Sequence, residues 1–395
     1  MSRLIFHIDV NSAFLSWTAA EQLKNGSQVD IREIPAIIGG DMASRHGIVL
    51  AKSIPAKAYR ITTGEPVAHA MQKCPNLHIV LPDHDLYTQY SRRLIQLLQN
   101  FCPIMEQASI DECYMDFTNF IGLYKSPVDA ATAIKDTVRD TLGFTVNVGI
   151  SSNKLLAKMA SDFQKPDRVH TLFPDEIPAK MWPLPVRELF MVGKSAAATL
   201  EKLEILTIGD LAHTDPAILE SHMKSHGRMI WKFANGIDDS PVQTEESQLK
   251  GVGNSTTLAE NARTAESAKA VLRSLCDQVA RRLHCYQQLA GMISTEIRYA
   301  TFINVSHQTQ LPHATDDPAV LYRYACQLFD ELWNGEPIRL LGVRTSKLVN
   351  EPEPVQMNLF DLAHTMKEVK ADKTAEALCK RFGDQIIRKG LPFPD

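Results

Sequence analysis

Apolar residues in the first 170 positions fall into short runs that predict β-strands separated by helices. Leu4 to Asp9 is an apolar run ending in a carboxylate, so we expect a buried strand that delivers Asp9 to the edge of a sheet. Thr145 to Ile150 has the β-branched alternation of another strand. The helix predicted after it has apolar side chains at helical spacing, namely Leu155, Leu156, Met159, Ala160 and Phe163. Weaker patterns predict strands at 36–40 and 47–51 and helices at 12–20 and 86–101.

The second half of the chain has a different pattern. After residue 166 we expect short helices, interrupted by prolines at 174, 178, 183 and 185. A polar segment from Asp238 to Gln248 predicts a linker. Beyond it, the pattern predicts strand, helix, two strands, helix and strand, at 251–258, 265–283, 290–299, 305–309, 319–333 and 338–349. This order is typical of a small α+β domain with its helices on one face of a sheet.

Composition limits the class of protein. A chain of 395 residues is expected to form two to four domains. A net charge of -4 gives no general sign of nucleic-acid binding, so that role would need local basic surface. Seven cysteines without a CxxC pair favour reduced thiols in a cytoplasm over disulfides or a structural zinc site. We find no leader and no apolar run long enough to span a bilayer, so we expect neither secretion nor membrane insertion.

Two adjacent carboxylates, Asp111 and Glu112, interrupt the apolar run from Ile104 to Phe117. Like charges this close repel each other, whereas a divalent cation makes both favourable. Asp9 is a third acid at a strand end. Mg²⁺ prefers oxygen ligands, and a pair of such ions supports in-line phosphoryl displacement. The alternative is a solvated turn and strand end, and the lysines at 154, 158 and 165 likewise fit a solvated helix face.

Three segments occur in an order that resembles a known family. They are FHIDVNSAF at 6–14, SIDECYMD at 109–116, and GISSNKLLAKMASD at 149–162 with Lys165-Pro166 after it. In this order they resemble the motifs of the Y-family (translesion) DNA polymerases, which include the UmuC-like polymerases. The resemblance covers about residues 1 to 350. It implies a template-directed DNA polymerase of low fidelity and low processivity that copies past lesions.

The resemblance also implies the fold, an α+β multidomain structure shaped as a right hand. Its parts would be a palm (1–18 and 76–165), small fingers (19–75), a helical thumb with a helix-hairpin-helix (166–237), a linker (238–249), an α+β little finger (250–349) and a flexible tail (350–395).

By the same resemblance, Asp9, Asp111 and Glu112 would be the catalytic carboxylates. They would hold two Mg²⁺ ions, with the backbone carbonyl of Val10 completing the shell of one ion. Phe14 stands at the position of the steric gate, where an aromatic ring leaves no room for a ribose hydroxyl. A core phenylalanine at the start of a helix is the alternative for Phe14.

Two lysines, Lys57 and Lys165, would hold the triphosphate of the incoming dNTP in this family. Ile54 departs from the family pattern, because a phosphate-contacting tyrosine is common there. The departure leaves fewer donors for the triphosphate and puts the strength of nucleotide binding in doubt.

Duplex DNA would be held by two further parts. The segment Val186 to Leu211 resembles the helix-hairpin-helix, in which Gly193 and Lys194 would contact a DNA phosphate. Met191 and Glu204 occupy positions where the motif usually has glycine, so we expect a distorted or weakly binding hairpin. The little finger would grip the duplex through its cationic residues, which are Lys250, Arg263, Lys269, Arg273, Arg281, Arg282, Arg298, Arg323, Arg339, Arg344 and Lys347.

The tail contains the pentapeptide QMNLF, which resembles the peptide by which bacterial polymerases bind the sliding clamp. Gln356, Leu359 and Phe360 would make this contact. The expected partners are therefore primer-template DNA, dNTPs and the clamp, with no membrane, for a monomer in the cytoplasm. Two other classes stay open, namely a catalytically weak or inactive DNA- and clamp-binding accessory protein and another palm-type transferase such as a nucleotide cyclase.

Overall fold

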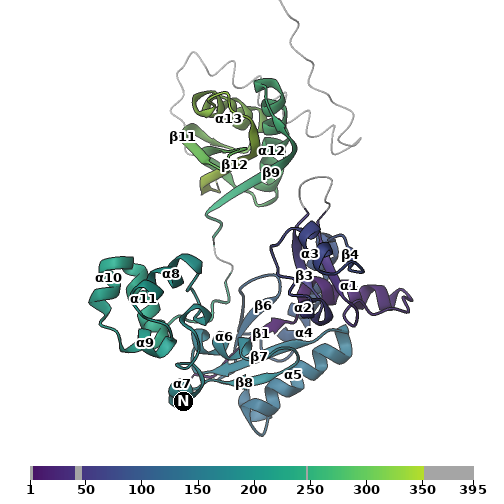
Figure 1. The fold of residues 1–395 in the computed structure, drawn as a ribbon, viewed down its shortest axis with the longest axis vertical. Coiled ribbons are helices and arrows are strands. Elements are labelled where there is room, and N and C mark those ends of the chain that lie inside the picture. Colours follow the sequence, from purple (N-terminus) through teal and green to yellow (C-terminus); the bar gives the residue numbers. More distant parts are fainter. Residues whose placement is uncertain (1–2, 41–46, 246–247, 351–395) are drawn as a thin grey trace, which may run out of the picture. The chain divides into compact units, whose positions relative to one another are not determined.

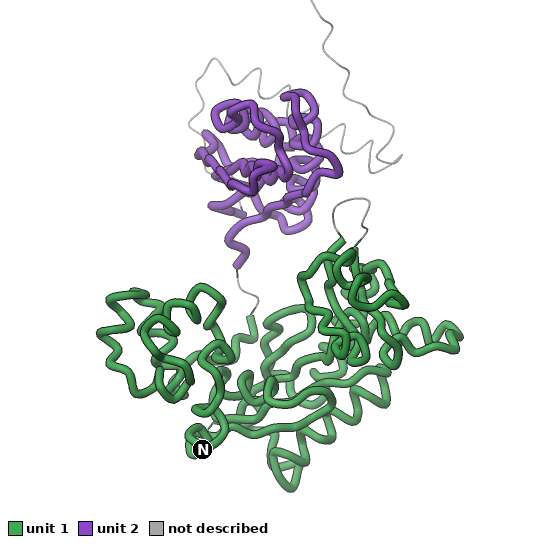
Figure 2. Tube along the Cα trace, viewed as in Figure 1, with its two compact units in different colours: residues 1–247 green, residues 248–395 purple. Residues whose placement is uncertain are grey.

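The computed structural model describes residues 3–40, 47–245 and 248–350 (Figure 1). The chain divides into two compact units, residues 1–247 and 248–395 (Figure 2). The division falls inside the polar segment predicted as a linker. Each unit is described by itself below.

A five-stranded sheet forms the centre of the first unit. Its strands lie in the order β5 (Met105–Gln107), β6 (Glu112–Asp116), β1 (Ile5–Val10), β7 (Val146–Ser151) and β8 (Val169–Thr171). All neighbours are antiparallel except β7 and β8, which are parallel. Because β8 belongs to this sheet, the sheet continues beyond residue 165, where we predicted the palm to end.

The two faces of this sheet differ in chemistry. Alternate residues such as Phe6, Ile8 and Val148 enter a large apolar core. The helices α1 (Ala13–Lys24), α4 (His84–Gln99) and α5 (Pro127–Leu142) also contribute to this core. The intervening residues, His7 and Asn147 among them, face α6 (Lys154–Asp162) instead and are bonded to it. One face of the sheet is therefore apolar. The other, called here the polar face, carries these polar side chains beside a small apolar cluster of Ile5, Tyr114 and Ala157, and helices cover both faces.

A second, three-stranded sheet has the order β3 (Val49–Lys52), β2 (Ala36–Gly39) and β4 (His78–Val80). The short helices α2 (Ile54–Ala58) and α3 (Val67–Lys73) pack with it around a small core of their own. We predicted the boundary between palm and fingers at residue 18, but α1 runs through it.

The region after β8 consists of short helices. Their bounds are η2 (Pro174–Glu176), α7 (Ile177–Lys180), η3 (Val186–Glu188), α8 (Lys194–Lys202), α9 (Ile208–His213), α10 (Pro216–Met223) and α11 (Ser225–Ala234). Prolines stand in the first turn of several of them, where the missing N–H has no helical partner to lose. One further short helix, η1 (Ile121–Leu123), lies between β6 and α5.

The second unit has the predicted order of elements. These are β9 (Gly251–Ala262), α12 (Ala265–Cys285), β10 (Leu289–Tyr299), β11 (Asn304–Thr315), α13 (Pro318–Leu332) and β12 (Ile338–Val349). The sheet has the order β11, β10, β12 and β9, and every pair is antiparallel. Inward residues such as Ile293, Ile297 and Val343 form one core with both helices. The expectation of an α+β domain with an apolar helix-bearing face is confirmed.

Two expectations from composition concern the whole chain. The six cysteines within the described ranges are free thiols. Among the residues that the structure describes, no helix is long and apolar enough to cross a membrane.

Candidate active site

The candidate site is built where α6 packs on the polar face of the five-stranded sheet. Gly149 of β7 permits this packing, because a Cβ there would lie 1.9 Å from the Ala157 carbonyl oxygen and 2.5 Å from the Ser161 nitrogen. Any side chain would therefore push α6 away from the sheet. The strands that carry Asp9 and Glu112 lie side by side, with these two residues directly opposite each other.

A cavity of about 360 Å³, called here the small cavity, brings together six of the residues that we predicted to act. These are Asp9, Val10, Phe14, Lys57, Asp111 and Lys165. Lys52 and Thr63 also line it, and sequence reasoning missed both because no motif marks them. Ile54 is not among the lining residues, and its side chain is 56% exposed.

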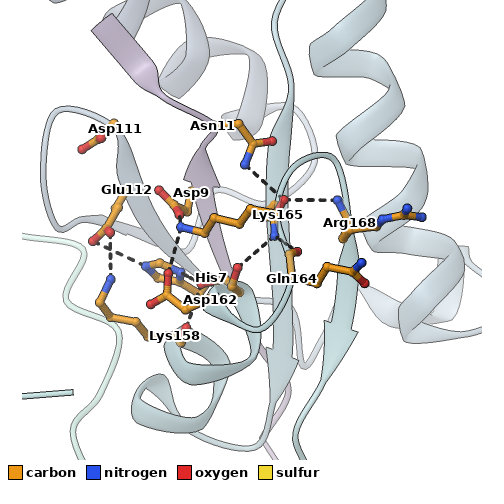
Figure 3. Close-up of polar contacts among 12 residues, drawn as sticks. His7, Asp9, Asn11, Asp111, Glu112, Lys158, Asp162, Gln164, Lys165 and Arg168 are labelled. Atoms are coloured by element: carbon orange, nitrogen blue, oxygen red, sulfur yellow. Dashed lines mark hydrogen bonds and ion pairs between the residues drawn. The ribbon is translucent and has the colours of Figure 1, made fainter. Parts of the chain in front are cut away.

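Asp9 is the most buried carboxylate of the site, at 5% exposure. Burial raises its pKa, and the neighbouring Lys165 ammonium counteracts part of that rise. Lys165 pairs with both Asp9 and Asp162, the latter at 2.8 Å (Figure 3). Burial alone would lower the pKa of Lys165, but the two carboxylates raise it. Lys165 therefore carries the positive charge that makes the buried Asp9 tolerable.

Asp111 lies in the turn before β6, and its neighbour Ser109 organises that turn. The Ser109 hydroxyl donates to Asp111 Oδ1 (2.6 Å) and accepts the Glu112 N–H (3.0 Å). The Val10 N–H donates to the Asp111 carbonyl (3.1 Å), which ties the turn to the end of β1.

Glu112 lines a different and larger cavity of about 940 Å³. Figure 3 shows its carboxylate directed at Lys158 and His7. Lys158 Nζ lies 2.7 Å from Glu112 Oε1, and His7 Nε2 lies 3.7 Å from Oε2. The His7 imidazole and the Lys158 ammonium together lower the pKa of Glu112 to about 2.

Two lysines of α6 therefore do not form a solvated face, which was the alternative interpretation from the sequence. Lys158 pairs with Glu112, and Lys154 Nζ lies 2.7 Å from Glu106. Both side chains are about 15% exposed. Each ammonium group is therefore paired with a carboxylate of the protein, and Lys158 is paired with Glu112, one of the predicted catalytic carboxylates.

The donors at this site suit a hard divalent cation. Asp9, Asp111, Glu112 and the Val10 carbonyl offer only oxygen atoms, the ligand type that Mg²⁺ prefers. Within the described ranges, no group of three His, Cys, Asp or Glu side chains is already gathered around one point. Lysines pair with Asp9 and Glu112 instead, so a cation would replace lysine as their counter-charge.

Phe14 both lines the small cavity and packs in the protein. Its ring stacks on Tyr87 with centroids 4.4 Å apart and an angle of 11°. The two readings that the sequence left open are thus compatible, since one face of a ring can pack while another borders the cavity.

The predicted hairpin of the thumb has two residues in the left-handed region. Met191 has φ 70° and Glu204 has φ 61°, a conformation that favours glycine. Gly193 is the N-cap of α8, and Lys194 is the first residue of that helix. At these two positions the backbone therefore has the conformation that glycine adopts most easily, although the residues present are methionine and glutamate.

The cations predicted for the little finger are divided between helices and sheet. Lys269 and Arg273 lie on α12, where Lys269 pairs with Asp330 and Arg273 stacks on Tyr322. Arg344 lines a hollow of about 550 Å³ on the sheet, together with Glu296 and small residues, which are Gly253, Ser255, Ser294, Ser306 and Gly342. The predicted clamp peptide at 356–360 lies outside the described residues.

Carboxylates at a strand end and an adjacent turn, facing lysines across one cavity, are the class of site that transfers phosphoryl groups with divalent cations. Comparisons with known proteins give the family. Residues 8–162 match the impB/mucB/samB family, and residues 249–359 match the C-terminal domain of that family. This chain belongs to that family, the Y-family of DNA polymerases.

Relatives align over nearly the whole chain. A DNA polymerase IV of Clostridium acetobutylicum is 48% identical over 99% of this chain and 98% of its own length. A DNA polymerase IV 1 of Bacillus subtilis is 35% identical over 98% of this chain and 93% of its own. Among solved structures, a Y-family DNA polymerase chimera, Dbh-Dpo4(243-245)-Dbh, matches with a TM-score of 0.76 at 22% identity, covering 88% of this chain and all of the other. The last match supports the right-hand fold.

Proposed function

We propose that the small cavity is where this chain, a translesion DNA polymerase of the Y-family, joins an incoming nucleotide to a primer on template DNA. The observation that carries the proposal is that Asp9 and Asp111 share this cavity with Lys57 and Lys165. The first pair suits divalent cations, and the second suits the phosphates of a nucleotide.

The primer 3′-hydroxyl loses its proton to solvent, and its oxygen forms a bond to the α-phosphorus of the dNTP. The bond from that phosphorus to pyrophosphate breaks, and pyrophosphate leaves. Asp9, Asp111, Glu112 and the Val10 carbonyl would hold two Mg²⁺ ions, which stabilise charge on the attacking and leaving oxygens. Lys57 and Lys165 would neutralise the triphosphate and align it for displacement.

The DNA and partner assignments rest on the family resemblance. The hairpin with Gly193 and Lys194 would hold a DNA phosphate, and the outer sheet face of the little finger would follow the duplex. Gln356, Leu359 and Phe360 would bind the sliding clamp, and such tethering would raise the local concentration of enzyme on DNA. We further propose that the enzyme is a monomer and works in the cytoplasm.

Primer extension by purified protein with Mg²⁺ and four dNTPs tests the proposed site. Asp111→Ala or Glu112→Ala is expected to lower extension by about a hundredfold to a thousandfold or more, since each removes charge stabilisation from the transition state. Binding of primer-template DNA is expected to persist. Asp140→Ala removes an exposed carboxylate on α5 and is the matched control. Extension that survives both active-site changes would refute the proposal.

Phe14 gives a second test, which concerns sugar selectivity. In Phe14→Ala, the ring no longer blocks the position of a 2′-hydroxyl, so incorporation of ribonucleotides should rise by roughly 10–100-fold, the range of steric discrimination in a pocket. Single-nucleotide incorporation with dNTP and NTP measures the ratio. An unchanged ratio in a folded, active variant would leave only the packing role of Phe14 against Tyr87.

A further inference from the structure

The loop at 164–168 joins α6 to β8 and carries Lys165. Two buried asparagines, Asn11 and Asn147, hold three of its backbone groups on both sides of that lysine. The bonds run from Asn147 Nδ2 to the Gln164 carbonyl (2.7 Å), from the Arg168 N–H to Asn147 Oδ1 (3.2 Å) and from the Asp167 N–H to Asn11 Oδ1 (2.9 Å). The backbone that carries Lys165 is thus fixed by one side chain from β7 and one from the residue that follows β1.

The two asparagines are also bonded to each other and to the rest of the sheet. Asn11 Nδ2 donates to Asn147 Oδ1 (3.1 Å), and the Thr145 hydroxyl donates to Asn11 Oδ1 (2.9 Å). Asn147 stands directly opposite Asp9 in the pairing of β7 with β1. The loop is therefore attached to the strand that carries Asp9, the carboxylate that Lys165 reaches.

The chemistry of position 147 requires an amide. Its Nδ2 donates to two backbone carbonyls, those of Ser161 and Gln164, while its Oδ1 accepts two N–H groups. A carboxylate would place oxygen against both carbonyls, and a hydroxyl has a single hydrogen to donate. Since Asn147 has no exposed surface, a lost partner leaves a buried polar group that bulk solvent does not reach.

We propose that Asn147 and Asn11 are positioning residues, which hold Lys165 where its ammonium group meets both Asp9 and the incoming triphosphate. The inference rests on the proposed function, because it takes the triphosphate as the ligand of Lys165. A lysine side chain is flexible, so fixing its backbone restricts where its charge lies. The loop has another tie to α5, where Lys135 Nζ binds Asp167 Oδ1 at 2.9 Å, so we expect the variants to keep the loop attached.

The test is a double-mutant cycle in single-turnover incorporation of one dNTP, which separates the nucleotide Kd from the rate of chemistry. Lys165→Ala alone tests the proposed function and should raise the Kd by about tenfold or more, the effect of one charge-assisted hydrogen bond. Asn147→Ala and Asn11→Ala should each raise the Kd severalfold in the wild-type background. Neither should raise it further in Lys165→Ala, because the group that they position is absent.

Ser151→Ala is the matched control. Ser151 is a fully buried residue of the same strand, and its hydroxyl donates to the Leu172 carbonyl (2.5 Å) away from the loop. It should lower the thermal midpoint as Asn147→Ala does and leave the nucleotide Kd unchanged. Equal effects of Asn147→Ala in both backgrounds, or a Kd shift in Ser151→Ala of the same size, would overturn the inference while the role of Lys165 stands. An unchanged Kd in Lys165→Ala would overturn that role and the inference together. If Asn147→Ala does not fold, Asn11→Ala decides by the same criteria.

Discussion

The five-stranded sheet of the first unit and the four-stranded sheet of the second each have one apolar and one polar face. In the first, α6 covers the polar face, and Asp9, His7 and Asn147 are buried beneath it. In the second, both helices pack on the apolar face, and the other face lines a hollow of about 550 Å³ with glycines, serines, Glu296 and Arg344.

The difference shows what covering a polar face requires. Beneath α6, the asparagines, Ser161 and the lysine-carboxylate pairs have partners, because a buried polar group without one costs about 1–3 kcal/mol. His7 Nε2 is an exception, since it has no hydrogen-bond partner and lies 3.7 Å from Glu112 Oε2. On the open face, polar groups need no protein partner, because solvent water can hydrogen-bond to them. The covered face suits chemistry with fixed charges, and the open face is the one proposed above to follow duplex DNA.

The largest expected effect compares one glycine from each sheet. Gly149→Ala should destabilise the first unit by about 3 kcal/mol or more, because its Cβ would meet the backbone of α6. Gly342→Ala meets only side chains, at 3.1 Å or more, and should change stability by less than about 1 kcal/mol. Urea unfolding followed by circular dichroism measures both. Equal tolerance of the two changes would contradict the close packing of α6.

A smaller effect concerns pH. The folded pKa of Glu112 is about 2, against an ordinary value of 4.5, so its stabilising contribution is present above pH 4.5 and is lost as the pH falls towards 2. Glu112→Gln should therefore cost about 1–2 kcal/mol at pH 7 after allowance for partial exposure. The cost should shrink as the pH falls through this window.

The control for this pH effect lies on the open face. Glu296→Gln should change stability by less than about 0.5 kcal/mol at each pH, as a substitution on a solvated surface does. Unfolding free energies of the three proteins at several pH values make the measurement. A pH-independent cost in Glu112→Gln would refute the ion-pair account of Glu112.

The smallest effect compares glycine substitution at two glutamates, one in the left-handed region and one within a helix. Glu204→Gly should stabilise the first unit by up to about 1 kcal/mol, because φ 61° is unfavourable for a residue with a Cβ. Glu201→Gly, within α8, should cost about 1 kcal/mol through lost helix propensity. Opposite signs in thermal unfolding are expected, and the same sign would contradict the left-handed assignment.

Much of the fold could be predicted from local pattern. The elements of the second unit follow the predicted order because its strands alternate inward and outward residues. In β10, Ile293, Thr295 and Ile297 are buried, whereas Ser294 and Glu296 line the hollow on the other face. The boundaries between palm, fingers and thumb were harder to predict from local pattern. The strand β8 has three residues, too few for periodicity to show, and α1 spans a boundary that motif positions alone suggested.

The sequence by itself determined the order of the elements, because that order depends on short-range periodicity. It also determined the identities of the candidate carboxylates and lysines, through the resemblance of its motifs to those of the Y-family. Only the tertiary structure decided that Glu112 faces Lys158 in another cavity, that Lys52 lines the small one, and that Asn147 holds the loop of Lys165. Such contacts depend on strand register, and a shift of one residue moves every side chain to the opposite face. Register joins β1 to strands more than 100 residues away, so local pattern does not contain it.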